Sequence, residues 1–222
     1  MKYLFALCLA LSFSVSASTM TQAGRYDNAP VLNQDHIIQV QKGAINAGEF
    51  YRYIKDNQLE VIEMLDQYFT TRNEMNILVE PRRIRRPPQQ PINRAKYESH
   101  LAKLEEQRQA IVAHYYHMEN QIYEWHDVQL LSEILVERGQ DNLNRFKMFL
   151  LKVFEYDAEY LESFDDLITL YEEEQLSYYI TENTINFIKP EVHRHFEKLK
   201  SLMEYSSERQ KHYIGQLKYF VK

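Results

Sequence analysis

The stretch that decides the fold runs from Asn93 to Arg138 and reads NRAKYESHLAKLEEQRQAIVAHYYHMENQIYEWHDVQLLSEILVER. It contains neither proline nor glycine, and Gly139 follows it. Apolar and aromatic residues recur along it at steps of four and three, interrupted by Arg108: Tyr97, Leu101, Leu104, Ile111, Tyr115, Met118, Ile122 and Trp125. That spacing puts them on one face of a helix. We therefore expect one long helix here, capped by Gly139, whose apolar stripe the rest of the chain covers.

Three further segments have helical patterns. One follows a predicted N-cap at Asp141 or Asn142 and carries Leu143, Phe146, Leu150, Val153, Asp157, Tyr160, Phe164, Leu167 and Tyr171. Another begins at Pro190, which suits a first helical turn, and carries Val192, Phe196, Leu199, Met203, Ser206, Tyr213, Leu217 and Phe220. The earliest follows Asn46 and Glu49, which have the spacing of a capping box. Its apolar face consists of Ile54, Val61, Ile62, Leu65, Tyr68 and Phe69.

These segments predict an all-α fold, an elongated antiparallel helical bundle of about four long helices with coiled-coil-like heptad packing. A short connection after Gly139 would make the second and third helices antiparallel neighbours. On that register Trp125 lies near Glu155, and Leu104 lies near Gln175. Residues 180–188 are poor in helix formers, so we expect a kink or a turn there.

The first residues, MKYLFALCLALSFSVSA, resemble a secretory signal over residues 1–17, with Lys2 before a short apolar run and small residues at its end. Residues 18–43 show little periodicity and predict an extended arm, so that the helical bundle covers residues 44–222. The single cysteine, Cys8, lies inside the predicted signal. An exported chain without cysteines needs no disulfide bond, and these features favour a bacterial periplasmic or secreted protein.

Charge and motifs narrow the class of function. The formal net charge of −6 disfavours nucleic acid as a partner. After removal of the signal we expect no transmembrane span. No histidine follows a glutamate by three positions, which removes the usual dimetal bundle, and no zinc-protease motif, phosphate loop or nucleophile elbow is present. We therefore expect no catalytic residues and no cofactor.

The least ordinary local feature is the segment over residues 80–92, which reads EPRRIRRPPQQPI. Its prolines predict an extended, non-helical connector. It carries a candidate partner-binding group of four arginines: Arg82, Arg83, Arg85 and Arg86. One interpretation is recognition of an acidic protein surface, anionic lipid headgroups or a polyanionic glycan. The other is a solvated loop whose arginines pair with Glu172 to Glu174.

Aromatic residues offer a second candidate site. At the predicted register several of them cluster at one level of the bundle, and they could line a pocket for an apolar or ring-bearing molecule: Tyr115, Tyr123, Trp125, Tyr156 and Tyr160. The competing interpretation is that they only fill the core. His114 and His117 lie three apart on one helix face, as metal ligands can, and the competing interpretation is a polar flank beside the apolar stripe.

The sequence thus predicts an exported, non-enzymatic helical-bundle protein. The first interpretation is that this protein is a structural, adaptor or protein-interaction component of the bacterial cell envelope or the secreted fraction. It would bind a protein partner, and contact with a membrane surface is left open. The alternative is a ligand-binding or sensory bundle with an aromatic-lined pocket. A pore-forming toxin would need a sheltered apolar segment, which we do not find in the sequence.

Overall fold

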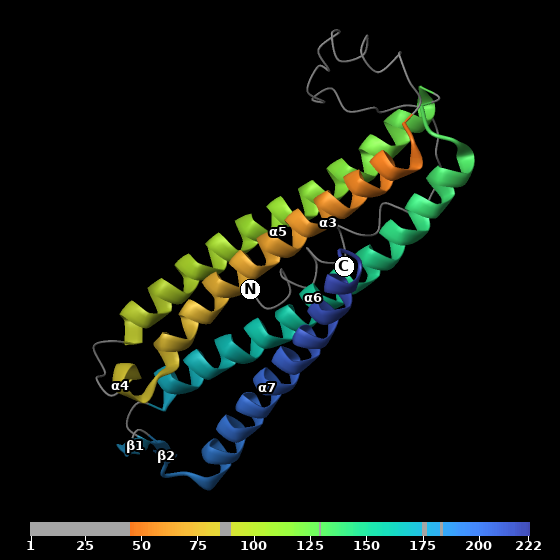
Figure 1. Cartoon of the computed structure of the whole chain (residues 1–222). Helices are drawn as coiled ribbons and strands as arrows, with labels where there is room; N and C mark the ends of the chain where they lie inside the picture. Colours follow the sequence, from red (N-terminus) through yellow and green to blue (C-terminus); the bar gives the residue numbers. More distant parts are fainter. Residues whose placement is uncertain (1–44, 85–89, 129, 175–176, 183) are drawn as a thin grey trace, which may run out of the picture. The chain divides into compact units, whose positions relative to one another are not determined.

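The computed structural model describes residues 45–84, 90–128, 130–174, 177–182 and 184–222, without the side chains of residues 90–92. The predicted signal (1–17), the predicted arm (18–43), Arg85 and Arg86 lie outside these residues. The elements, in chain order, are α3 (Ala47–Glu74), the 3-10 helix η2 (Met75–Val79), α4 (Pro81–Ile84), α5 (Gln90–Asp127), α6 (Glu133–Glu173), β1 (Tyr178–Thr181), β2 (Thr184–Phe187) and α7 (Pro190–Tyr219) (Figure 1).

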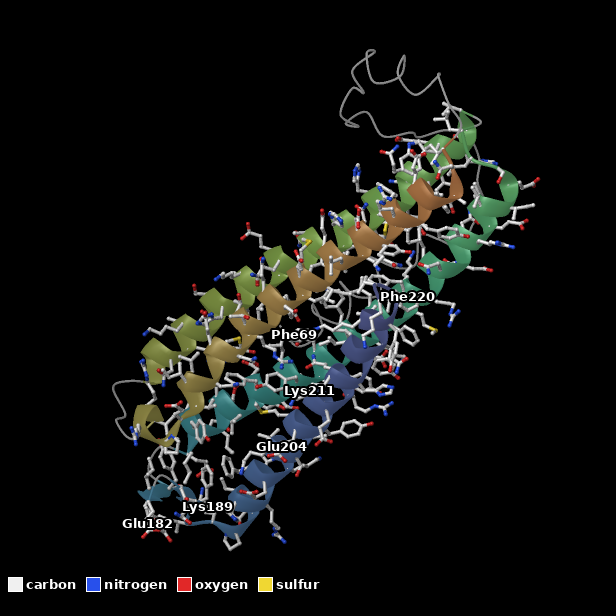
Figure 2. All side chains as sticks on the ribbon, viewed as in Figure 1. Phe69, Glu182, Lys189, Glu204, Lys211 and Phe220 are labelled. Carbon is white, nitrogen blue, oxygen red and sulfur yellow. The ribbon has the colours of Figure 1, made fainter. Side chains whose placement is uncertain are left out.

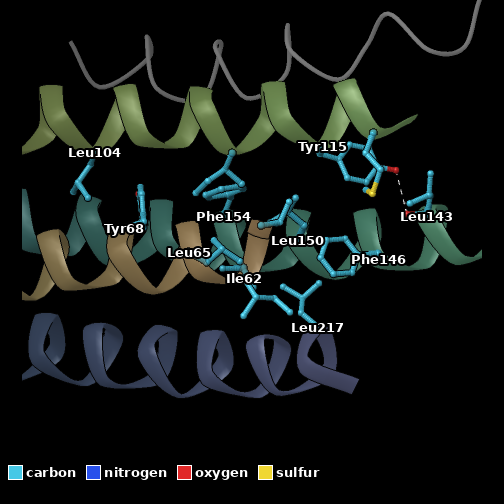
Figure 3. Packing of buried hydrophobic residues seen from close by; sticks show 14 of the residues in the cluster. Ile62, Leu65, Tyr68, Leu104, Tyr115, Leu143, Phe146, Leu150, Phe154 and Leu217 are labelled. Atoms are coloured by element: carbon cyan, nitrogen blue, oxygen red, sulfur yellow. Dashed lines mark hydrogen bonds between the residues drawn. The ribbon is translucent and has the colours of Figure 1, made fainter. Parts of the chain in front are cut away.

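The predicted all-α bundle is confirmed. Helix α3 packs along α5, and α6 packs along α7, with α5 and α6 also in contact (Figure 1). All nine residues of the predicted stripe from Leu143 to Tyr171 are buried. Figure 3 shows how aromatic and aliphatic side chains from α3, α5, α6 and α7 interlock in this core. Heptad spacing therefore identified the faces that the helices bury.

The predicted starts of the first and last helices are also confirmed. The backbone N–H of Glu49 donates to Asn46 Oδ1 at 3.0 Å, and the N–H of Asn46 donates to Glu49 Oε2 at 3.2 Å. This reciprocal pair satisfies two donors that a helix start otherwise leaves open. Pro190 occupies the first turn of α7, where its missing N–H leaves no hydrogen bond unmade.

The prediction of one continuous helix over residues 93–138 is wrong beyond Asp127. Helix α5 ends at Asp127, and α6 begins after Ser132, whose extended backbone marks the N-cap. Leu130 and Leu131 are 8% and 5% exposed. The N–H of Ile45 donates to the carbonyl of Leu130 at 3.1 Å. Burial of these two leucines beside the beginning of α3 accounts for a turn where local helix preference alone predicts continuation.

Gly139 is not a cap but lies inside α6. A Cβ atom on this residue would sit 2.5 Å from Cζ of Phe50, a fully buried side chain of α3. Glycine is therefore needed here for the close approach of α6 to α3. A helix-ending glycine and a packing glycine are indistinguishable in one sequence without the neighbouring helix.

Moving the turn changes the predicted register of α5 against α6. The Tyr115 hydroxyl donates to the carbonyl of Leu143 at 3.1 Å (Figure 3), and the Tyr97 hydroxyl donates to the carbonyl of Leu161 at 3.2 Å. The predicted pairing of Trp125 with Glu155 is therefore wrong, and so is the level assigned to Leu104. Both errors follow from placing the turn at Gly139.

The connector over residues 80–92 is partly helical, contrary to prediction. Pro81 opens the short helix α4, and Pro91 lies in the first turn of α5. A proline in a first turn costs no intrahelical hydrogen bond, so these two prolines start helices rather than prevent them. Ile84 anchors α4, because its side chain is 1% exposed.

The turn predicted over residues 180–188 is a two-stranded antiparallel hairpin. Ile180 pairs with Ile185, and Tyr178 pairs with Phe187. Glu182 adopts a φ of 49° at the tip, a left-handed conformation suited to a tight hairpin turn. Ile185 and Phe187 are buried in a second apolar cluster with residues of α4, α6 and α7. The β-branched residues that weaken the helix here favour strands.

Candidate functional site

A cleft of about 560 Å³ lies between the η2–α4 segment, α6, strand β2 and the first half of α7. Its floor is apolar and largely aromatic: Tyr160, Leu167, Tyr171, Ile185 and Phe196. Its walls carry Val79, Pro81 and Met203, and polar residues border it: Asn76, Thr184, His193, Glu197, Lys200, Glu204 and Ser207. A cavity of several hundred Å³ with an apolar, aromatic floor and polar groups at its border is typical of a ligand site.

Tyr160 connects the cleft to the interior. Its hydroxyl donates to Asn76 Oδ1 at 2.7 Å, and the guanidinium of Arg72 lies 4.2 Å from the centre of its ring. Burial, with the nearby Asp157 charge, raises the pKa of Tyr160 despite the opposing effect of Arg72. The phenol therefore stays protonated, and its ring has a fixed place in the cleft floor.

Behind Tyr160 lies a buried polar network that joins α3, α6 and α7. Arg72 Nη1 contacts Asp157 Oδ1 at 3.0 Å and also donates to Gln210 Oε1. Gln210 Nε2 donates to Asp157 Oδ1 at 2.9 Å, and the Tyr68 hydroxyl donates to Asp157 Oδ2. Burial and the Asp157 charge raise the pKa of Tyr68, so this phenol remains a donor. The network fixes α7 against the other two helices.

Part of this network was visible in the sequence. Asp157 is the one charged member of the stripe over residues 143–171, and it is 2% exposed. Arg72 was missed, although it follows Tyr68 by four residues on the apolar face of α3. A charge in a stripe indicates a buried partner, but the partner's identity depends on which helices meet.

The hairpin end of the cleft is aromatic. The rings of Tyr171 and Phe196 are 6.3 Å apart, and those of Phe187 and Phe196 are 5.3 Å apart. Lys200 Nζ lies 5.3 Å from the centre of the Phe196 ring and 3.7 Å from Glu197 Oε2. Burial, the neighbouring phenol of Tyr178 and the Glu197 charge together raise the pKa of Tyr171.

Arg82 and Arg83 lie on α4 next to Pro81, which lines the cleft. Arg82 is exposed and Arg83 is half-buried. Two of the acids proposed as their partners are engaged elsewhere. Arg94 contacts Glu172 at 2.8 Å and Asp165 at 2.5 Å, and Lys189 contacts Glu174 at 3.0 Å. Within the described part of the chain, neither Arg82 nor Arg83 forms an ion pair.

The five aromatic residues predicted to share a pocket are not brought together. Tyr115 is buried against Leu143 near one end of the bundle. Trp125, a member of the predicted stripe, is half-buried and meets the ring edge of Tyr53 at 4.6 Å between ring centres. Tyr123 is 41% exposed. The displaced turn explains this separation, because it moves α5 along α6.

The remaining two aromatics lie farther along α6. Tyr156 stacks on Tyr213 with ring centres 5.8 Å apart, and the guanidinium of Arg209 lies over both rings. Of the five predicted residues, Tyr160 alone lines the cleft. The other rings of the cleft floor belong to Tyr171 and Phe196. Both residues are members of the predicted apolar stripes, and nothing in the sequence shows that they border an opening.

The two histidines do not converge on further ligands. His114 Nε2 lies 3.4 Å from Glu60 Oε2, and His117 is exposed on the same helix. Among the described residues, no group of three or more histidine, cysteine, aspartate or glutamate side chains is placed to hold a metal ion.

Comparisons with known proteins add no function: no family model, no curated protein and no solved structure matches this chain. Within the part that the structure describes, no helix is both long and apolar enough to cross a membrane. The cleft and its surroundings are therefore the basis for the function proposed below.

Proposed function

We propose that this chain is an exported, non-enzymatic helical-bundle protein of the bacterial cell envelope or the secreted fraction, and that it acts by binding a ligand in the cleft. The observation that carries this proposal is the apolar floor of Tyr160, Tyr171 and Phe196 beneath a polar border. The aromatic-lined pocket was expected at another level of the bundle, and the cleft supports the same class of function with a lining that shares only Tyr160 with the predicted set.

Blocking the cleft tests this proposal. Ser207 borders the cleft, so Ser207→Phe should fill its inner end. Ser201 lies exposed on the same helix and does not line the cleft, so Ser201→Phe is the matched control. Native mass spectrometry of the full chain drawn from its own host compartment should show a bound small molecule on wild type and on the control. Loss of that mass is expected for Ser207→Phe, whereas equal occupancy of all three proteins would contradict a function in this cleft.

A second candidate function is that of an adaptor that binds a protein partner through the α4 segment. It is favoured by the pairing of Glu172 and Glu174 with Arg94 and Lys189, which leaves Arg82 and Arg83 without acidic partners among the described residues. Guanidinium groups bind carboxylates in a bidentate manner, which suits an acidic protein surface.

We predict that replacing Arg82, Arg83, Arg85 and Arg86 together with Gln leaves the melting temperature within a few degrees of wild type. The buried stripes carry the fold, and exposed charges contribute little. Capture of an acidic partner should weaken, and added salt should weaken the wild-type interaction in the same direction. A lowered melting temperature with unchanged capture would instead show that these arginines serve folding.

A further inference from the structure

We infer that the cleft is a site for an organic ammonium group carried on an apolar or aromatic body, an inference that rests on the proposed binding function. The chemistry follows from the two ends of the cleft and from a lysine that already occupies part of it.

The cleft is elongated along α7. Its border residues on this helix recur at helical spacing from His193 through Glu197, Lys200 and Glu204 to Ser207. Four turns of helix correspond to about 20 Å, so the cleft suits an extended molecule rather than a compact one. Figure 2 shows Glu204 on α7 between Lys189 at its start and Phe220 at its end.

The inner end of the cleft is rich in acceptors. Asn76 lies there with its Oδ1 accepting from Tyr160, and Glu204 and Ser207 border the same region. Glu204 is exposed and forms no ion pair with any described residue. Two turns earlier on the same helix, by contrast, Glu197 is paired with Lys200. The unbalanced charge among the lining residues is therefore the carboxylate of Glu204.

The protein itself shows which charge the aromatic floor accepts. Lys200 places its ammonium 5.3 Å from the centre of the Phe196 ring while it contacts Glu197. The π-face of an aromatic ring attracts cations, and a nearby carboxylate strengthens the preference. A ligand ammonium at Glu204 would repeat this arrangement beside Tyr160, with its apolar body over Leu167 and Met203.

The competing chemistry is an anionic ligand drawn by Arg82 and Arg83. These side chains belong to α4, but Pro81 is the α4 residue that lines the cleft. The probes must therefore separate charge from apolar body. Three molecules share one body and differ in the head group: 4-phenylbutylamine, 4-phenylbutanol and 4-phenylbutyrate.

Isothermal titration of the full chain with these probes tests the inference. The amine should bind more tightly than the alcohol, and the carboxylate should bind most weakly. Glu204→Gln should weaken amine binding by roughly two- to fivefold and leave alcohol binding unchanged. Glu208→Gln is the control, because Glu208 lies exposed on the same helix outside the cleft. Lys200→Gln should strengthen amine binding by removing a competing cation.

The outcomes separate the inference from the function on which it rests. If 4-phenylbutyrate bound as tightly as 4-phenylbutylamine, the ammonium assignment would be overturned, but the cleft would still be a ligand site. An absence of binding by all three probes, together with equal native occupancy of Ser207→Phe and wild type, would overturn both.

A last arm compares the amine with N-acetyl-phenylalanyl-lysine amide, since a free amine and a lysine side chain offer the same group. Tighter binding of the peptide identifies a protein source, tighter binding of the amine identifies a small molecule, and failure of both contradicts the inference.

Discussion

Replacing Arg72 with Met should lower the free energy of unfolding by about 3–5 kcal/mol, the usual range when one partner of a buried ion pair is removed. The side chains of Arg72 and Asp157 are only 6% and 3% exposed. Without the guanidinium, the Asp157 carboxylate keeps Tyr68 and Gln210 as donors but loses its counter-charge in a site closed to water. Urea denaturation followed by circular dichroism measures the change.

Two controls show whether the loss arises from the orphaned charge. The double variant Arg72→Met with Asp157→Leu should recover most of the stability, because an apolar replacement removes the uncompensated charge. Lys152→Met breaks the exposed pair between Lys152 and Glu155, and it should leave the urea midpoint nearly unchanged. A loss below about 1 kcal/mol for Arg72→Met would mean that water reaches Asp157 and that the network does not hold α7.

Two glycine-to-alanine substitutions should have opposite effects on stability. Gly215→Ala in α7 should stabilise the protein by about 0.5–1 kcal/mol, because no atom lies within 4 Å of the added Cβ and alanine favours helix. Gly139→Ala in α6 should destabilise it by about 1–3 kcal/mol, because the added Cβ would meet the Phe50 ring at 2.5 Å. The two variants should therefore differ by about 1.5–4 kcal/mol.

Thermal and urea unfolding of both variants measure this difference. A shorter side chain at position 50 provides the control. Gly139→Ala should destabilise a Phe50→Leu protein less than it destabilises wild type, because the obstructing ring is gone. If Gly139→Ala stabilised the protein as much as Gly215→Ala, Gly139 would have no role in the packing of α6 against α3.

The buried faces of the helices could be predicted because they depend on local spacing. Residues such as Phe146, Val153 and Phe164 recur at three and four positions, and any neighbouring helix buries them. The end of α5 at Asp127 and the start of α6 at Glu133 could not be predicted in this way. Leu130 and Leu131 continue a helical pattern, and what ends α5 is their burial beside the start of α3, a contact between segments far apart in the chain.

The cleft was even harder to predict from the sequence than the end of α5. Tyr160, Tyr171 and Phe196 belong to apolar stripes that also supply the core, and nothing local distinguishes a floor residue from a core residue. The cleft exists because α3 ends at Glu74 while α6 and α7 continue to the hairpin. Its location therefore depends on the relative lengths of three helices. Charges within stripes, such as Asp157, remain the most informative local signal.

The binding role of the cleft is tested most directly at Met203, which lies in its wall. The full chain carrying carbon-13 in its methionine methyl groups is titrated with 4-phenylbutylamine and followed by NMR, with Met203→Leu used to assign the signal. Met148, which is 51% exposed on α6 outside the cleft, is the internal control. We predict a saturable shift of the Met203 signal with no shift of the Met148 signal. Equal shifts of both signals, or a Met203 signal that does not move at a saturating concentration of the amine, would contradict binding of an organic ammonium ligand in this cleft.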